Sequence, residues 1–206
     1  MKTTQLTAEI LRKKSFLCVG LDVDMDKVPS AFRNSPTALV DFSKAIIDAT
    51  VDYAVAYKPN IAFFETYGVE GMAALKEVID YLNAKHPEIF TIADAKRGDI
   101  GNTSTRYAKA YFETLGFDSI TVAPYMGKDS VEPFLVFKDK HTILLALTSN
   151  PGSNDFQRLE TNEKPLFQSV LETAKTWEGS DQLMYVVGAT RADALTDIRK
   201  IVPDAF

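Results

Sequence analysis

The feature that most constrains the fold is a regular alternation of short apolar runs and longer amphipathic stretches. The runs are rich in β-branched and aromatic residues and are too short for buried helices, so they predict strands. Their apolar residues are continuous rather than alternating with polar ones, which is typical of parallel strands covered by helices on both faces. The six runs span residues 15–23, 53–59, 90–95, 119–124, 141–148 and 183–189.

Helical patterns fill the segments between these runs. Ser35 and Pro36 predict a helix start, with the serine as N-cap and the proline at the first helical position. Gly116 predicts the end of another helix. The first 16 residues lack the apolar core of a signal peptide and predict a short amphipathic helix. The helices that follow the six runs are expected over residues 37–50, 69–85, 103–116, 130–140, 165–177 and 191–202.

Polar residues at the ends of the runs decide between two architectures for a parallel sheet. An open, doubly wound sheet gathers its ligand groups at one switch point. A TIM (β/α)8 barrel collects them from many strand ends around one mouth. The spread over five runs favours the barrel, and no Gly-x-Gly-x-x-Gly follows the first run to indicate a dinucleotide site. The polar residues at or just past the run ends are Asp22, Lys58, Asp94 with Lys96, Tyr125 and Ser149.

The number of runs is two short of a complete barrel. Only about six β/α units are present in the chain, and each unit takes about 30 residues. We therefore expect residues 1–206 to form a single barrel domain that is incomplete at its C-terminus, with about 60 further residues expected beyond Phe206.

Composition narrows the function classes. The net charge of −5 and the pI of about 5.1 give no basic surface for nucleic acid or an anionic membrane, and no apolar run of 18 residues predicts a membrane span. The single cysteine, Cys18, lies in an apolar run and is expected to be buried and inert in a reducing compartment, the cytoplasm. His86 and His141 lack partners at metal-ligand spacing, so no metal site is expected.

A dense charge cluster follows the third run. Asp94 and Lys96 are two apart and share one face of a strand, and Gly98 allows a turn that brings in Asp99. A carboxylate about 4 Å from the lysine contributes about 4 kcal/mol at an effective dielectric of about 20, before desolvation. Two such neighbours favour the charged lysine, which suits a proton donor rather than a Schiff base. Lys58 can join from the next strand; a purely structural ion-pair network is the alternative reading.

Several motifs are similar, in order, to one enzyme family. "IADAKRGDIGNTSTRYAKAYF" (92–112) resembles the signature of the orotidine 5′-phosphate decarboxylases, most closely of their longer bacterial branch. The resemblance runs from about residue 15 to the last residue. The strand ends that carry the rest of it are "CVGLDVD", "YKPNIAFFETYG", "TVAPYMG", "LLALTSNPGSNDFQ" and "YVVGATR".

The resemblance implies a cofactor-free decarboxylation of orotidine 5′-phosphate to UMP, the last step of pyrimidine nucleotide synthesis, without a metal. It implies that Lys96 protonates C6 of the pyrimidine, and that Asp94 lies beside the substrate carboxylate and holds Lys96. It also implies that Lys58 and Asp22 contact the ribose hydroxyls, and that Ser149 hydrogen-bonds the pyrimidine.

The resemblance also implies a homodimer with shared active sites. Asp99, Ile100 and Thr103 would reach into the site of the partner subunit. The phosphate-binding residues, which in barrels often follow the last two strands, are expected beyond Phe206.

Two alternatives stay open at this point. A magnesium-dependent sugar-phosphate decarboxylase or hexulose-phosphate synthase of the same superfamily would use the same Asp-x-Lys-x-x-Asp strand, although "TSNPGS" suits a pyrimidine better. An inactive nucleotide-binding fragment, or an interaction protein that kept the scaffold, is the other. The polar segment 149–165 is interpreted as a lid over the base or as a surface connection.

Overall fold

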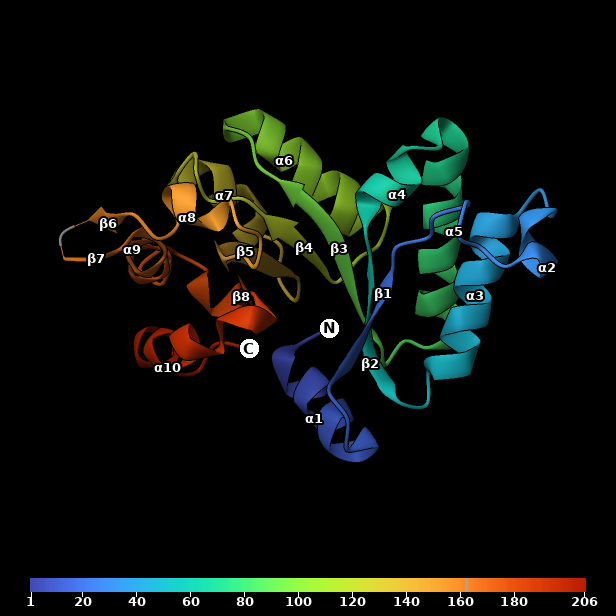
Figure 1. Cartoon of the computed structure of the whole chain (residues 1–206), viewed down its shortest axis with the longest axis horizontal. Helices are drawn as coiled ribbons and strands as arrows, with labels where there is room; N and C mark the ends of the chain where they lie inside the picture. The colour runs from blue at the N-terminus through green and yellow to red at the C-terminus, as the bar shows by residue number, and fades with distance from the viewer. Residues whose placement is uncertain (162) are drawn as a thin grey trace. The chain divides into compact units, whose positions relative to one another are not determined.

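The computed structural model describes residues 1–161 and 163–206, which form two compact units (Figure 1). Unit 1 comprises Met1–Ala95 and Lys109–Ile120, and unit 2 comprises Lys96–Ala108 and Thr121–Phe206. Strands β3 (Phe90–Arg97) and β4 (Ser119–Val122) contribute residues to both units. Each unit contains parallel strands of the sheet together with its own helices.

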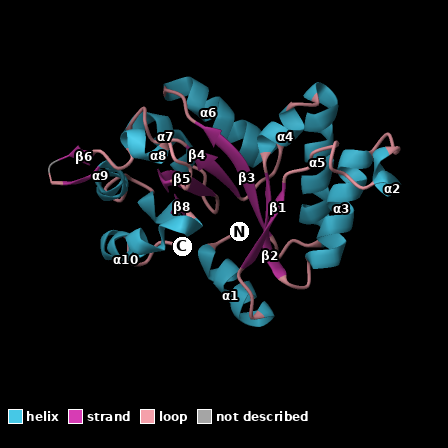
Figure 2. Ribbon diagram, in the orientation of Figure 1, coloured by secondary structure: helices cyan, strands magenta, loops and turns pink. Residues whose placement is uncertain are grey.

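Unit 1 has the strand order β1-β2-β3-β4, and Figure 2 shows its strands running side by side. Strand β1 (Leu17–Leu21) pairs in parallel with β2 (Ala54–Pro59), with Gly20 opposite Lys58. Five of the six residues of β2 are buried, as the continuous apolar run predicts. The helices and the π-helical turn of unit 1 are α1 (Thr3–Lys13), α2 (Ser30–Arg33), α3 (Ala38–Thr50), α4 (Ile61–Glu65), α5 (Gly68–Lys85) and η1 (Ala110–Thr114).

Helices α3, α4 and α5 pack closely in unit 1 (Figure 1). Helices α4 and α5 approach closely at Gly71 of α5, where an added Cβ would lie 1.9 Å from the carbonyl oxygen of Phe64 in α4. The side chains of Ile47, Phe64 and Leu75 are fully buried. A glycine at position 71 is thus what lets the two helices meet.

Unit 2 has the strand order β3-β4-β5-β8. Strand β5 (His141–Leu147) pairs in parallel with β8 (Leu183–Val187), with Ile143 opposite Met184. A small antiparallel ribbon of β6 (Glu160–Thr161) and β7 (Lys164–Pro165) forms a separate sheet. The helices are α6 (Gly101–Lys109), α7 (Lys128–Leu135), α8 (Ser153–Phe156), α9 (Leu166–Ala174), η2 (Ser180–Gln182), η3 (Ala189–Arg191) and α10 (Ala192–Ile201).

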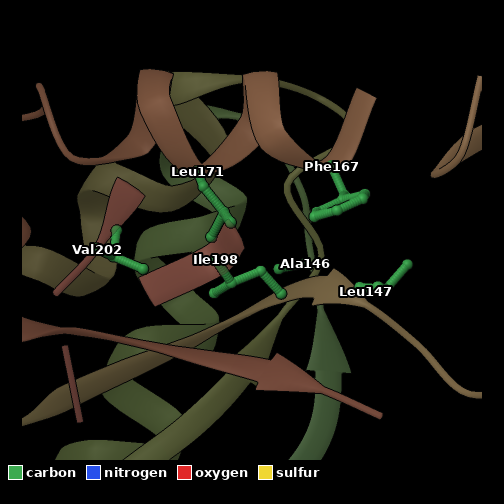
Figure 3. Packing of buried hydrophobic residues seen from close by; sticks show 6 residues of the cluster. All are labelled: Ala146, Leu147, Phe167, Leu171, Ile198 and Val202. Carbon is green, nitrogen blue, oxygen red and sulfur yellow. The ribbon is translucent and has the colours of Figure 1, made fainter. Parts of the chain in front are cut away.

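The core of unit 2 joins β5 to its two last long helices. Figure 3 shows Phe167 and Leu171 directed from α9 toward Ala146 of β5 and Ile198 of α10. Each of these side chains is at most 4% exposed. Burial of this cluster fixes both helices against β5, which ends two residues before the predicted site residue Ser149.

All six predicted strands and the helices after them are confirmed. Gly116 ends its helical stretch in the left-handed conformation, with φ +82°, as predicted. The predicted helix start at Ser35 and Pro36 is wrong, because the helix begins at Ala38. Ser35 instead donates to the Asp41 carboxylate from the preceding turn.

The prediction of a buried Cys18 is also wrong. Cys18 is exposed, because β1 is the first strand in the order of the sheet and pairs only with β2 among the described residues. The prediction of one barrel domain over residues 1–206 stays a prediction. Within the described part of the chain, no helix combines the length and the apolar character needed to cross a bilayer.

Candidate active site

Three predicted site residues lie together at strand ends of unit 1. The Lys58 ammonium donates to Asp94 Oδ2 at 3.2 Å, and the Asp94 side chain is 11% exposed. Asn60 pairs with Asp94 as an isolated parallel bridge, and its amide Nδ2 donates to Asp22 Oδ2 at 3.5 Å. The carboxyl ends of parallel strands meet at one edge of a sheet, so β1, β2 and β3 bring Asp22, Lys58 and Asp94 into one cluster.

Asn60 also lies in this cluster, although the sequence prediction did not include it. Its side-chain oxygen accepts from the backbone N–H of Ala62 and caps α4, while its backbone N–H donates to Leu21 O at 3.4 Å. Asn60 thus lies between β2 and α4, and its side chain also contacts the Asp22 carboxylate that follows β1. Its position two residues after Lys58, in "YKPN", was the only signal available in the sequence.

Lys96 lies near the end of β3, in unit 2, with an unusual backbone. Its φ is +48°, in the left-handed region, and its backbone N–H donates to the Thr121 hydroxyl at 2.8 Å. One residue later the Arg97 carbonyl accepts from the Ala123 N–H at 2.8 Å. Gly98 then approaches Ala123 closely, since an added Cβ would lie 3.2 Å from the Ala123 carbonyl oxygen. The predicted proton donor therefore sits at a tight, well-bonded turn.

The residues after this turn open α6. Asp99 Oδ1 accepts from the Ile100 N–H at 2.7 Å, and the Ile100 carbonyl accepts from the Thr103 N–H at 3.2 Å. Gly101 between them has φ +50°. Ile100 is 58% exposed. The structure brings these three predicted residues together in one helical turn.

Ser149 lies two residues after the end of β5, close to Gly188, which follows β8. The Gly188 N–H donates to the Leu147 carbonyl at 2.8 Å. An added Cβ at Gly188 would lie 2.8 Å from both the Cβ and the backbone nitrogen of Ser149. Only glycine lets the two strand ends approach this closely, so Gly188 sets the position of Ser149.

The segment after Ser149 is tied back to β5 by Gln157. Gln157 Oε1 accepts from the Thr148 N–H at 2.7 Å, and Gln157 Nε2 donates to the Thr148 hydroxyl oxygen at 2.9 Å. The Thr148 hydroxyl donates to Asn150 Oδ1 at 2.6 Å. The lid interpretation of residues 149–165 stays a prediction, and Asn162 of that segment lies outside the described residues.

In the described part of the chain, no cluster of three or more histidine, cysteine, aspartate or glutamate residues could hold a metal ion. At the strand ends, the Lys58 ammonium and the Asp94 carboxylate form an ion pair. Such a site can position substrate hydroxyl groups and a negative charge by hydrogen bonds alone.

Comparison with known proteins gives one consistent result. The model of the "Orotidine 5'-phosphate decarboxylase / HUMPS family" matches residues 15–205. The orotidine 5′-phosphate decarboxylases of Christiangramia forsetii and Flavobacterium johnsoniae are each 64% identical over 206 residues, all of this chain and 76% of each relative. The orotidine 5′-phosphate decarboxylase of Bacteroides fragilis is 55% identical over 207 residues, which cover 100% of this chain and 76% of that relative.

Solved structures agree with these relatives. The Leishmania donovani OMP decarboxylase has a TM-score of 0.88 at 42% identity, covering 100% of this chain and 78% of that one. A Toxoplasma gondii structure described as a putative orotidine-monophosphate-decarboxylase has a TM-score of 0.88 at 34% identity, covering 98% and 76%. The predicted fold class, a TIM (β/α)8 barrel with about six β/α units present in this chain, is confirmed.

Proposed function

Because the chain belongs to the orotidine 5′-phosphate decarboxylase / HUMPS family, we propose that it acts in the decarboxylation of orotidine 5′-phosphate to UMP and carbon dioxide. This is a carboxy-lyase reaction of pyrimidine nucleotide biosynthesis. The observation that carries the proposal is the Lys58–Asp94 ion pair at the strand ends, with Lys96 two residues further along β3. The 64% identity to decarboxylases over the whole chain supports it.

The proposed reaction needs no external oxidant or reductant. The bond between C6 and the carboxylate breaks, carbon dioxide leaves, and the electron pair stays on C6 in the plane of the ring. The Lys96 ammonium donates a proton to that pair and recovers one from solvent. A fixed cation beside the developing charge stabilises the transition state more than the ground state. This is why neither a metal nor an organic cofactor is required.

The other site residues orient the substrate in this proposal. Asp94 lies beside the substrate carboxylate, and the hydrogen bond from Lys58 keeps the Asp94 side chain in place. Lys58 and Asp22 bind the ribose hydroxyls, since an ammonium donates and a carboxylate accepts. Ser149 bonds the pyrimidine. Its place between β5 and Gly188 supports a fixed contact rather than a mobile one.

We also propose that the active form is a homodimer in the cytoplasm. Asp99, Ile100 and Thr103 would act in the site of the partner subunit. Ile100 is 58% exposed and Asp99 is half-buried, so both are open to contact from another subunit. Phosphate-binding residues beyond Phe206 remain a prediction.

The sugar-phosphate alternative is not favoured. The family description includes the HUMPS branch, but the relatives that are 52–64% identical are orotidine 5′-phosphate decarboxylases. The reading as an inactive fragment is not favoured either: the chain spans 76% of the length of relatives that are named as decarboxylases.

The deciding experiment compares the chain with its Lys96→Ala variant. Turnover of orotidine 5′-phosphate is followed by ultraviolet absorbance, with and without Mg²⁺. We expect a loss of roughly 10²–10⁴-fold, the usual contribution of a positioned acid, or more. Lys200→Ala is the control, because Lys200 is a surface lysine with a 71% exposed side chain. Activity of Lys96→Ala within tenfold of the parent would remove Lys96 from the donor role, and a strict need for Mg²⁺ would favour the sugar-phosphate class.

A further inference from the structure

We propose that Thr121 is a positioning residue for Lys96. Its buried hydroxyl holds the Lys96 backbone in the left-handed conformation from which the lysine side chain acts. This inference rests on the role proposed above for Lys96. Thr121 itself belongs to β4 and was not predicted as a site residue.

The backbone of Lys96 is the first observation. Four non-glycine residues have positive φ among the described residues. Lys14 is the C-cap of α1, and Asp139 and Glu163 lie in turns, where such a conformation is common. Lys96 lies inside β3, where φ is ordinarily near −120°. An L-residue there is disfavoured because its Cβ crowds the next carbonyl oxygen, so neighbouring groups must hold it.

The hydroxyl of Thr121 is the second observation. Thr121 Oγ1 accepts from the Lys96 N–H at 2.8 Å, and the Thr121 residue is 2% exposed. A β-branched side chain in a strand has a restricted χ1, so this oxygen has a fixed position. A second bond lies close by: the N–H of Ala123, just after β4, donates to the Arg97 carbonyl oxygen at 2.8 Å. The backbone is therefore held at two successive residues: the Lys96 N–H donates to the Thr121 hydroxyl, and the Arg97 carbonyl accepts from the Ala123 N–H.

This arrangement bears on proton transfer through geometry alone. The φ angle of Lys96 sets the direction in which its Cβ, and hence its ammonium, leaves the strand. A misplacement of about 1 Å of a reacting group can cost about 10²-fold in rate. Thr121 is buried in the strand and is proposed to act through Lys96, so its loss should change kcat rather than KM.

The experiment uses matched substitutions at this one position. Thr121→Val keeps the shape and the β-branch but removes the acceptor, whereas Thr121→Ser keeps the acceptor and loses one methyl group. We expect Thr121→Val to lower kcat by roughly 10- to 100-fold with KM within about twofold, and Thr121→Ser to stay within about threefold of the parent. In a Lys96→Ala background, Thr121→Val should lower the residual rate no further.

Thr142→Val is the control for removing a buried threonine hydroxyl from a strand. Thr142, in β5, is 0% exposed, and its hydroxyl has no hydrogen-bond partner among the described residues. We expect this variant to keep the parent kcat. Thr121→Ser failing as badly as Thr121→Val would overturn the proposal, as would a Thr121→Val variant with reduced Tm but unchanged kcat.

A structural readout separates this inference from the proposed function. The φ angle of Lys96 in Thr121→Val is obtained from a crystal structure or from amide–Hα couplings by NMR. We expect it to leave the left-handed region. If the parent chain fails to decarboxylate orotidine 5′-phosphate, the proposed function fails, but the Lys96 φ still decides the role of Thr121. A φ that stays positive without the hydroxyl would overturn the inference.

Discussion

The two opposite charges at the ends of β2 and β3 depend on one another. Lys58 is 35% and Asp94 is 11% exposed at the side chain, and their charged atoms lie 3.2 Å apart. Removing one member of a partly buried pair costs more than the pair itself contributes, because the other charge loses its compensation. Replacement of either residue should therefore disturb the site more than the loss of one substrate contact would.

Lys58→Ala should lower kcat/KM for orotidine 5′-phosphate by roughly 10²–10³-fold, the range for removing one preorganised electrostatic group. Steady-state kinetics measure the effect, with the surface variant Lys200→Ala as the reference. A value within tenfold of the parent would mean that Lys58 contributes only to the ion pair and not to substrate binding.

Gly188→Ala should lower kcat/KM by roughly 10- to 100-fold, because the new methyl group would displace Ser149 from its proposed contact with the pyrimidine. Ser149→Ala is made alone and in combination. If displacement of Ser149 is the cause, the two changes together should cost little more than the larger single effect. Fully additive losses would show that Gly188 acts elsewhere.

These residues show what a sequence can reveal at this scale. Lys58 and Asp94 could be predicted because charged residues at the ends of parallel strands must meet at one edge. Asn60, Thr121 and Gly188 could not. Their roles depend on partners 25 to 39 positions away in the chain, and the alignment of those partners is set by strand register, which no local pattern encodes.

At the scale of elements, the hydrophobic periodicity of the sequence does not predict where helices pack closely or at which residue a helix begins. The hydrophobic period predicted α3 and α5 correctly, since period and length are local properties. It did not predict α4, which is only five residues long, or the start of α3. The helix starts two residues later than Pro36, because Ser35 and Thr37 both turn toward Asp41.

Gly71→Ala should be strongly destabilising, because the added methyl group would meet the Phe64 backbone carbonyl, which cannot rotate away as a side chain would. We expect a loss of about 3 kcal/mol in the free energy of unfolding, the upper end for overpacking. Urea unfolding measures it. Val69→Ala, two residues away at an 87% exposed position, should stay within about 0.5 kcal/mol. Equal effects of the two variants would contradict the close contact.

The start of α3 should depend on pH. The hydroxyls of Ser35 and Thr37 donate to Asp41 at 2.7 and 2.8 Å, and these two bonds hold the pKa of Asp41 below its usual value. A lowered folded-state pKa stabilises the fold above the ordinary carboxyl pKa of about 4, and the contribution is lost as pH falls through the lowered value. Ser35→Ala should reduce Tm at pH 7, and the difference from the parent should narrow below about pH 4. A constant difference down to pH 2 would contradict this.

At the scale of the whole molecule, the proposed dimer makes the site a property of two chains. The pattern of six strands predicted a parallel sheet covered by helices, and the spread of polar residues over the strand ends then favoured the barrel over an open sheet. Subunit pairing could not be predicted in the same way. It entered through the resemblance of Asp99, Ile100 and Thr103 to a family motif and stays a proposal.

Mixing inactive subunits tests the pairing. A Lys96→Ala subunit supplies an intact Asp99, and an Asp99→Ala subunit supplies an intact Lys96, so each heterodimer has one complete site. With random assortment, about a quarter of the parent activity should return. Heterodimers are verified by differently tagged subunits. Their formation without any recovered turnover would count against shared sites.

Cys18, the exposed cysteine of β1, has to be controlled for in the subunit-mixing experiment. Cys18 is the only cysteine in the chain and is accessible at the surface, so two chains can be joined covalently by an oxidant. Such a cross-link would persist through dilution and gel filtration and could be mistaken for the functional assembly. A Cys18→Ser background removes this artefact. The same position, left intact, offers a unique attachment point for a fluorophore or a nitroxide with which subunit exchange can be timed.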